Sequence, residues 1–423
     1  MDFDVARALE RVQGALLPAL DIVSERVDDA RVPEWCAARG WTDFLLALQG
    51  RDLERCEAEG LAYAARTLPE LPASLSELAA QVRELSALPA LVGAPTGAGV
   101  ADEEYRGVSR RKREQLSILL GALDPLAAPA RRIVDVGAGS GHFTRLAAQH
   151  FERAALGLER NPDRVKSASR RLDRHNDRTF LAEFAVLDAG REPLLLRPDD
   201  LAIGLHACGE LGDALVTAVA TSGCDLGLVS CCLQKISGPV RIPLSHAARE
   251  LTLHRGTLGL SNLTSQTQGV EVQIELTMQA RRTRFALRRL LMARGLDIPP
   301  GAEMQGINRR RAHFGLRDIA SRALEQRGLA PGSAAEFAEH EAAAALDFEV
   351  VRRLSLPRNM LARAIELGVV LDRAMRLSEN DYAVLVATLF DRAVTPRNIS
   401  LFASRHRARL PRVRLPAQSE RRS

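Results

Sequence analysis

Aromatic residues are scarce in this sequence, at 4% of 423 positions, and long apolar runs are absent. No stretch reaches eighteen uninterrupted apolar residues, so no membrane span is predicted. The first twelve residues include acidic side chains and lack the apolar core of a secretory signal. Together these features predict a cytoplasmic protein.

Cysteines are also few, and they are irregularly spaced. The six are Cys36, Cys56, Cys208, Cys224, Cys231 and Cys232. They lack the density and regular spacing of a disulfide framework, and 46% hydrophobic residues suffice to bury a core without cross-links. Free thiols in a reducing compartment are therefore expected.

The net charge of +5 is concentrated at one end of the chain. From residue 405 onward seven arginines oppose one glutamate, a net of +6, which leaves about −1 for everything before. We predict that 405–423 is a basic disordered tail. The tail and the basic segments 109–113 and 308–311 are candidate contacts for RNA, and the alternative is that they are solvated surfaces.

Apolar and helical segments alternate in the middle of the chain. Five apolar segments of strand character are separated by stretches of helical period: 131–139, 153–159, 180–188, 200–209 and 224–232. This alternation predicts an α/β fold with a parallel sheet covered by helices on both faces. Near the end, one amphipathic helix is expected over 358–379, and then two strands, 383–390 and 398–404, joined by a turn around Thr395-Pro396.

The predicted organisation is that of a class I methyltransferase (Rossmann-like) fold, a seven-stranded sheet with a closing antiparallel hairpin. Its expected parts are a helical N-terminal region (1–100), the first part of the core (108–236), a mainly helical insertion (237–345), the last helix and hairpin (346–404) and the tail (405–423). A linker rich in glycine and proline is expected within 91–105.

A glycine-rich loop follows the first predicted core strand and begins a helix. It contains Asp135, Gly137, Gly139 and Gly141. Glycines allow a sharp turn and let a ligand lie close to main-chain amides, and the following helix N-terminus favours a carboxylate. The glycines do not follow the G-x-G-x-x-G order of nicotinamide and flavin sites. Asp135 can accept hydrogen bonds from loop amides or bind the amino group of a methionine moiety.

Two further acids stand at the ends of the next strands. Glu159 ends the second strand, where a carboxylate can accept hydrogen bonds from both ribose hydroxyls. Asp188 ends the third, where it can bind an adenine amine, although Asp-Ala-Gly is also good turn chemistry. Three acids and three glycines in this arrangement predict S-adenosylmethionine as the cofactor.

The fourth and fifth strands end in a histidine and three cysteines. His206 is a candidate general base or cofactor contact, and Cys208 a candidate cofactor contact. Cys231 and Cys232 are candidate catalytic residues, either as a covalent nucleophile or as small buried thiols beside the cofactor. His206, Cys208 and one or both of this pair could form a zinc site, but adjacent cysteines do not easily bind one ion with relaxed geometry. We therefore predict no metal site.

Several segments resemble a known family. Residues 134–148, 204–216 and 230–235 are similar to the methyltransferase-like protein twenty-five group and, more distantly, to the transfer-RNA ribose methylase with a Cys-Cys-His-His motif. The likeness continues over 109–120, 362–379 and 386–403. It implies cofactor contacts at the loop glycines, Glu159 and Asp188, with 206–209 along the pocket. Ser140 replaces a common lysine, and Leu233-Gln234 replaces an aromatic or histidine, so a catalytic role taken from the ribose methylases does not transfer.

The sequence thus predicts an S-adenosylmethionine-dependent methyltransferase acting on RNA or a ribosome-associated substrate. The fourth strand lacks the Asn-Pro-Pro-Tyr motif that binds an exocyclic amine, which disfavours adenine N6 methylation. The alternatives are a protein or small-molecule methyltransferase, and a non-catalytic S-adenosylmethionine-binding interaction protein.

Overall fold

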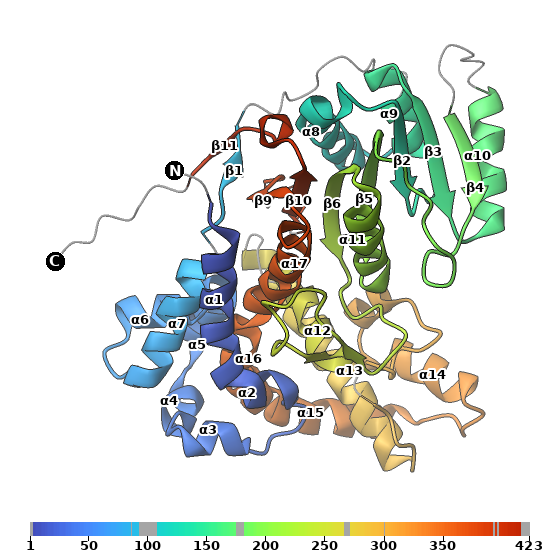
Figure 1. Ribbon diagram of the computed structural model, residues 1–423. Coiled ribbons are helices and arrows are strands. Elements are labelled where there is room, and N and C mark those ends of the chain that lie inside the picture. Colours follow the sequence, from blue (N-terminus) through green and yellow to red (C-terminus); the bar gives the residue numbers. More distant parts are fainter. Residues whose placement is uncertain are drawn as a thin grey trace. The chain divides into compact units, whose positions relative to one another are not determined.

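The computed structural model describes residues 3–85, 87–92, 108–174, 182–265, 271–299, 301–391, 394–395 and 397–415. These residues form two compact units, and each unit is assembled from separate parts of the chain (Figure 1). Unit 1 contains 1–18, 81–265 and 362–423, and unit 2 contains 19–80 and 266–361. The predicted linker within 91–105 lies almost wholly outside the described residues.

Unit 1 is built on one mixed sheet. Within the described residues it has nine strands in the order β11-β1-β9-β10-β6-β5-β2-β3-β4. Their bounds are β1 Ala90–Leu91, β2 Arg132–Val136, β3 Ala154–Glu159, β4 Ala182–Val186, β5 Asp200–Cys208, β6 Asp225–Cys231, β9 Ala383–Thr388, β10 Ile399–Ser404 and β11 Val413–Arg414. Strands β2 to β6 pair in parallel, whereas β10 is antiparallel to both β6 and β9.

The sheet confirms the predicted fold class. All five predicted core strands form, and β9 and β10 are the predicted closing hairpin. The seven strands from β9 to β4 are the expected core, and β1 and β11 extend it at one edge. Residue Pro396 of the predicted turn lies outside the described residues.

Helices cover both faces of this sheet (Figure 1). On one face α8 (Arg110–Ala127) and α9 (His142–Phe151) pack with the strands in a buried cluster that includes Leu119, Leu146, Ile203 and Phe402. α11 (Glu210–Ser222) packs against β5, β6 and α17 (Ala362–Ser378), and α10 (Pro162–Arg174) packs against β4. The remaining elements of unit 1 are α1 (Val5–Leu16), β7 (Val240–Arg241), β8 (Leu253–His254), α12 (Arg255–Leu260), η3 (Ser261–Ser265) and η5 (Arg407–Arg409).

The last helix predicted over 358–379 forms, but it is not a single amphipathic helix. The chain forms α16 (Leu356–Met360) and then α17, in which Ala362 and every residue from Ala364 to Ala374 is buried. α17 is covered on one side by β9 and β10 and elsewhere by α1, α11 and α12, so no face remains for solvent. A helix buried all round has no polar stripe to display, and its charged residues must find partners inside.

Unit 2 is helical in its described residues. Its helices are α2 (Leu20–Ser24), α3 (Glu34–Ala38), α4 (Thr42–Ala47), α5 (Gly50–Glu59), α6 (Leu61–Thr67), most of α7 (Ala73–Leu85), α13 (Glu271–Ala293), η4 (Arg309–Phe314), α14 (Leu316–Gln326), α15 (Ala334–Leu354) and α16. α13, α14 and α15 enclose a core that includes Leu287, Leu290 and Ile319. The N-terminal helices join them through buried polar contacts, for example from Arg352 to Glu57 at 2.8 Å.

The two units change the predicted domain boundaries. Residues 1–100 and 237–345 were each expected to form one region, but α1 packs on α17 in unit 1, and 237–265 also belong to unit 1. Helices of the predicted N-terminal region and of the predicted insertion share unit 2, where they are joined, for example, by the ion pair between Arg288 and Asp28 at 3.0 Å. Such a pairing of segments 186 or more residues apart leaves no local signal in the sequence.

The prediction of a disordered tail from residue 405 is wrong for its first part. η5 and β11 lie within it, and β11 pairs with β1 through Ala90–Arg414 and Leu91–Val413. The Arg409 guanidinium lies 3.2 Å from the Asp225 carboxylate, and that of Arg405 lies 5.5 Å from the centre of the Tyr382 ring. Residues 416–423 lie outside the described residues.

Candidate active site

The glycine-rich loop connects β2 to α9, as predicted. Its three glycines have left-handed backbone angles, with φ of 84° at Gly137, 59° at Gly139 and 75° at Gly141. The Gly137 and Ala138 amides donate to the Leu158 carbonyl at 2.8 and 3.0 Å, which attaches the loop to the end of β3. Residues with a Cβ rarely adopt such angles, so the loop requires glycine at these positions.

Two of the glycines are needed for different reasons. A Cβ on Gly141 would lie 2.4 Å from Cζ of Phe184 and 2.9 Å from Cβ of Ala168, so this glycine permits close packing of the protein on itself. A Cβ on Gly139 would meet only the Gly137 carbonyl oxygen, at 3.9 Å. The space above Gly139 is therefore open, as a ligand lying against the main chain requires.

Asp135 is buried at the end of β2, with 3% of its surface exposed. Its carboxylate accepts from the Thr144 hydroxyl, which donates to Oδ2 at 2.7 Å, and from the main-chain amide of the same residue. Burial raises the pKa of Asp135 to about 6, against the Thr144 hydrogen bond and the charge of Lys112, which lower it. Sequence reasoning missed Thr144, although its place in the first turn of the following helix put it within reach.

Glu159 ends β3 and binds the loop directly. Its Oε2 accepts from the Gly139 amide and its Oε1 from the Asn161 amide, both at 3.0 Å. Each carboxylate oxygen has two acceptor positions, so both remain able to accept from a ribose hydroxyl. Glu159 is buried, with 8% of its surface exposed, and its carboxylate is in direct contact with the loop.

Asp188 lies two residues beyond the end of β4, not at its last position. Its Oδ1 accepts from the Gly190 amide at 3.1 Å, and Oδ2 is 3.9 Å from the exposed Arg191 side chain. Asp188 therefore has the turn-stabilising role that the Asp-Ala-Gly sequence predicts. The half-exposed carboxylate still has acceptor positions for an adenine amine, so that role stays a prediction.

His206 interrupts the end of β5. Its φ is 64°, and the pairing of β5 with β6 shifts register between Leu205 and Ala207. A left-handed non-glycine residue within a strand is a strained conformation of the kind found at functional sites. Burial lowers the pKa of His206, and the positive charges of Lys112, Arg397 and Arg111 lower it further. The imidazole is therefore neutral at neutral pH and able to accept a proton.

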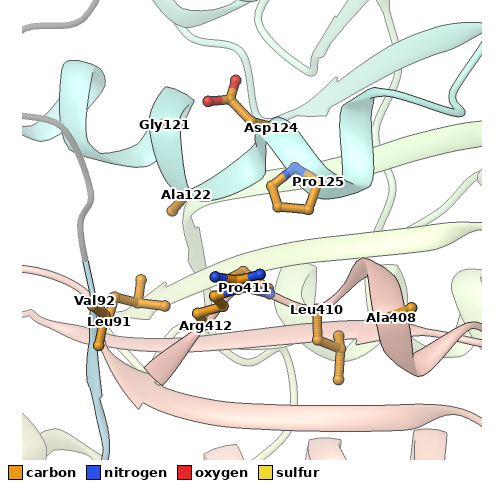
Figure 2. Close-up of a pocket in the computed structure, with 10 residues that line it drawn as sticks. All are labelled: Leu91, Val92, Gly121, Ala122, Asp124, Pro125, Ala408, Leu410, Pro411 and Arg412. Carbon is orange, nitrogen blue, oxygen red and sulfur yellow. The ribbon is translucent and has the colours of Figure 1, made fainter. Parts of the chain in front are cut away.

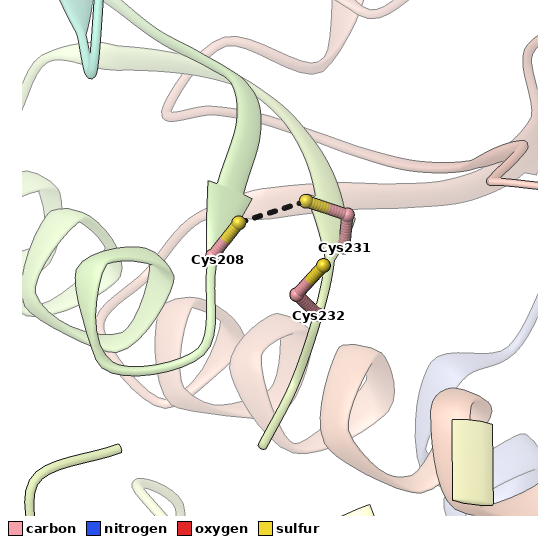
Figure 3. A group of neighbouring side chains, drawn as sticks. All are labelled: Cys208, Cys231 and Cys232. Atoms are coloured by element: carbon pink, nitrogen blue, oxygen red, sulfur yellow. Dashed lines mark hydrogen bonds between the residues drawn. The ribbon is translucent and has the colours of Figure 1, made fainter. Parts of the chain in front are cut away.

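The three cysteines of these strand ends lie together (Figure 3). Cys208 and Cys231 are register partners on β5 and β6, and their sulfurs share a hydrogen bond at 2.9 Å. Both sulfurs also lie within 3.3 Å of the His206 carbonyl oxygen. The hydrogen bond from Cys231 lowers the pKa of Cys208 to about 6 and raises that of Cys231.

A buried arginine holds the same strand ends in place. Arg373 of α17 has no exposed side-chain surface, and it donates to the Gly209 carbonyl and to the Ser230 hydroxyl, each at 2.6 Å. Its Nε donates to Asp213 at 2.8 Å. Arg241 bridges Asp213 to Asp372, both within 2.9 Å. Sequence reasoning missed this network because its members are up to 164 residues apart.

Positive side chains surround the strand ends and the loop. Besides the cations that act on His206, a basic hollow on α10 is lined by Asp163, Lys166, Ser167, Arg170 and Arg171. Arg171 donates to the Ser140 carbonyl at 2.9 Å, which places this hollow beside the glycine loop. The cations outnumber the single acid in it.

A second pocket, of about 490 Å³, lies where the end of α8 faces β1 and the segment before β11 (Figure 2). It is lined by Leu91, Val92, Gly121, Ala122, Asp124, Pro125, Ala408, Leu410, Pro411 and Arg412. Asp124 has the one carboxylate in this lining, and its Oδ1 lies within hydrogen-bond distance of His150 Nε2, at 2.8 Å. This lining contains no group of reactive side chains, so the strand ends remain the candidate site.

Comparison with known proteins agrees with the loop and the sheet. A family model described as a methyltransferase domain matches residues 111–239, from α8 to just beyond β6. The chain contains a methyltransferase domain. At the level of this domain, the prediction of a methyltransferase is confirmed.

Solved structures of methyltransferases are similar to parts of the chain. Magnesium protoporphyrin IX methyltransferase of Synechocystis PCC 6803 is 18% identical over 31% of this chain and 61% of that one, with a TM-score of 0.24. The tRNA (uracil-54, C5)-methyltransferase of Pyrococcus abyssi is 23% identical over 28% and 29%, with a TM-score of 0.23. The chain thus spans less than two thirds of each of these structures, and their substrates are their own.

Proposed function

We propose that this protein transfers the methyl group of S-adenosylmethionine to RNA or to a ribosome-associated substrate. The observation behind the cofactor is the carboxylate of Glu159 hydrogen-bonded to the amide of Gly139, which has the most open space above it among the three loop glycines. A cofactor lying there meets main-chain amides and a ribose acceptor together.

The residues of the loop fit the parts of this cofactor. Asp135 is the candidate partner of its ammonium group, Glu159 of its ribose hydroxyls and Asp188 of its adenine amine. Bound there, the cofactor supplies an electrophilic methyl group. The strand ends of β5 and β6 border the crevice outside the sheet, where ligands of such folds bind. His206 and Cys208 are therefore the side chains expected beside the reacting methyl group.

Methyl transfer forms a bond from the acceptor atom to the methyl carbon and breaks the sulfur–methyl bond. An acceptor that carries a hydrogen must also lose a proton. The neutral imidazole of His206 is the described group at the strand ends best suited to accept that proton, because burial and nearby cations keep it unprotonated. Positioning of the acceptor supplies much of the remaining rate enhancement.

An anionic acceptor is favoured by the charges around the site. Lys112, Arg111 and Arg397 lie near enough to His206 to act on its charge, and Lys166, Arg170 and Arg171 line the hollow beside the loop. A polyanion gains affinity from several such contacts at once. The resemblance of 204–216 and 230–235 to the methyltransferase-like protein twenty-five group and the transfer-RNA ribose methylase supports the same acceptor class.

Two other functions are distinguished by experiment. A protein or small-molecule methyltransferase would use the same loop with a different acceptor. A non-catalytic interaction protein would bind the cofactor without transferring the methyl group.

Calorimetric titration with S-adenosylmethionine tests the cofactor site. We expect saturable binding to the wild type and a loss of about tenfold to a hundredfold in affinity for Glu159→Ala, the range for a hydrogen bond to a charged group. Glu183→Ala is the matched control, since this glutamate is exposed on the neighbouring strand β4. No binding to the wild type, or equal affinity for wild type and Glu159→Ala, would contradict the proposal.

Transfer of tritiated methyl groups into a cell extract tests the acceptor. The extract is then separated into RNA, protein and small molecules, and label in the RNA fraction is expected. Label in protein or small molecules supports the alternative enzymes. Cofactor binding without label in any fraction supports the interaction protein.

A further inference from the structure

We propose that Cys208, Cys231 and Cys232 bind one thiophilic metal ion, Zn²⁺, and leave its fourth coordination position open. The sulfurs of these three residues all lie within 4.8 Å of one another at the ends of β5 and β6. Among the described residues this is the one group of at least three histidine, cysteine or acidic side chains close enough to share an ion. The cluster lies at the strand ends that the proposed function places beside the cofactor, and Cys208 belongs to both sites, but ion binding by the three sulfurs does not depend on the proposed function.

The backbone resolves the objection raised by two adjacent cysteines. Successive side chains of a strand point to opposite faces, which would keep the sulfurs of Cys231 and Cys232 apart. β6, however, ends at Cys231, and Cys232 has a φ of 38°, a left-handed conformation that turns the chain out of the strand. Figure 3 shows the Cys231 sulfur directed toward that of Cys208 and the Cys232 sulfur directed toward that of Cys231.

The spacing fits a tetrahedral thiolate site with a small adjustment. At Zn–S bonds of about 2.3 Å, two sulfurs of a tetrahedral site are about 3.8 Å apart. The upper limit of 4.8 Å within the cluster is compatible with this distance. The Cys208–Cys231 separation of 2.9 Å would widen as the shared thiol proton is lost and each sulfur bonds to the ion.

Positive side chains near the cysteines favour the negative charge that a site of three thiolates and one Zn²⁺ would have. Three thiolates around Zn²⁺ have a net charge of −1, and the side chains of Lys235 and Arg397 contribute positive charge near Cys208. Arg373 holds both strand ends, through the Gly209 carbonyl and the Ser230 hydroxyl, so the main chain next to Cys208 and Cys231 is positioned before an ion binds. Three protein ligands with an open position are the pattern of zinc sites that bind a further ligand.

Cobalt substitution tests this site without relying on activity. The full chain is purified under reducing conditions, treated with a chelator and titrated with Co²⁺. We expect about one ion per chain, an intense thiolate-to-cobalt charge-transfer band, visible bands of tetrahedral cobalt, and their loss on addition of Zn²⁺. Elemental analysis of the untreated protein measures zinc content directly.

Single substitutions assign the ligands. Cys208→Ser and Cys232→Ser are each expected to weaken Co²⁺ binding by about tenfold or more and to reduce the charge-transfer band. Cys224→Ser is the control, because this buried cysteine precedes β6 and hydrogen-bonds to Ser222 outside the cluster. Circular dichroism shows whether each variant is folded. Cys232→Ser is expected to disturb folding least, because Cys232 follows the last residue of β6 and is only partly buried.

Three results would overturn the inference. The first is wild-type protein with reduced thiols that gives no charge-transfer band. The second is a band that persists unchanged in both folded cysteine variants. The third is a Cys208–Cys231 disulfide found by mass spectrometry in protein that binds no ion even after reduction, which would make the pair a redox couple. Calorimetry with S-adenosylmethionine is scored separately, so failure of the metal site and failure of the cofactor site are distinguished.

Discussion

Asp135 shows how one side chain combines binding with a cost in stability. Its carboxylate is buried beneath the glycine loop, where the hydroxyl and the main-chain amide of Thr144 donate hydrogen bonds to it. Burial without a paired cation disfavours the ionised form, which raises the pKa to about 6. An ammonium group of a bound ligand would restore the missing partner.

The affinity for S-adenosylmethionine should therefore depend on pH through Asp135. The ionised carboxylate binds the ammonium group, so affinity rises as pH increases through about 6. At one pH unit below that value about a tenth of the carboxylate is ionised, and affinity is about tenfold below its plateau. Calorimetry from pH 5 to 8 measures this change. Asp135→Asn is expected to bind weakly with no step, and a wild-type curve as flat as that of the variant contradicts the assigned role.

The same group predicts the pH dependence of stability. The folded pKa of about 6 exceeds the ordinary aspartate value of 3.8, so the folded state binds the proton more tightly and loses stability as pH rises through this window. Asp135→Asn keeps an acceptor for Thr144 and removes the charge. Relative to wild type the variant should gain up to about 3 kcal/mol in free energy of unfolding between pH 4 and 7. Urea denaturation at pH 4 and 7 measures the free energy of unfolding of both proteins. If the difference between variant and wild type is the same at both pH values, the raised pKa of Asp135 is contradicted.

At the scale of an element, the glycine loop separates packing from ligand approach. Gly141→Ala would place a Cβ against Phe184 and Ala168, and it would also force alanine into a left-handed conformation. Gly139→Ala has the same backbone cost but meets only a carbonyl oxygen at 3.9 Å. Both substitutions add one methyl group at a left-handed position, and they differ only in the space around that methyl group.

We expect Gly139→Ala to lose about 1 kcal/mol of stability and Gly141→Ala about 2–4 kcal/mol, because overpacking adds to the backbone cost. Gly139→Ala should nevertheless weaken cofactor binding, since its new methyl group fills the space above the loop. Thermal unfolding and calorimetry measure the two effects. Equal loss of stability in the two variants, with cofactor affinity unchanged by Gly139→Ala, would show that the open space is not the binding surface.

The strand ends that contain His206 and the cysteines depend on α17. Arg373→Met removes the cation that joins Asp213, Ser230 and Gly209, and breaking such a buried network costs about 3–5 kcal/mol. Arg31→Met is the control, because Arg31 pairs with Asp29 while 89% of its side chain is exposed, and such exposed pairs contribute little to stability. Denaturant unfolding compares them, and similar losses in both would contradict a structural role for the network.

At the scale of the whole molecule, the basic end of the chain is partly structural. Removing 405–423 deletes β11, the Arg409–Asp225 ion pair and the stacking of Arg405 on Tyr382. We expect this truncation to lower the free energy of unfolding by about 1–3 kcal/mol. Removing only 416–423 retains all three contacts and should leave stability unchanged. If both truncated chains unfold like the full chain, β11 does not stabilise unit 1.

Only local information could be obtained from the sequence. The alternation of apolar and helical segments identified β2 to β6, and the separate segments 383–390 and 398–404 identified the hairpin, because strand period and turn residues are properties of neighbours. The loop was identified for the same reason, since its glycines and Asp135 are within seven residues. Glu159 was found because parallel strands end at one edge of a sheet. Thr144, Arg373 and the shared helical unit were not found, because their partners are distant in sequence.

The sequence by itself determined the class of fold, the loop and the chemistry of its acids, since these follow from residue type and spacing along a strand or a turn. Tertiary structure alone decided which residues meet: α17 lost its expected solvent face because α1, α11, α12 and the sheet cover it, and the tail joined the sheet through β1. It also gathered Cys208, Cys231 and Cys232, since a left-handed residue after β6 turned together side chains that a regular strand would have separated.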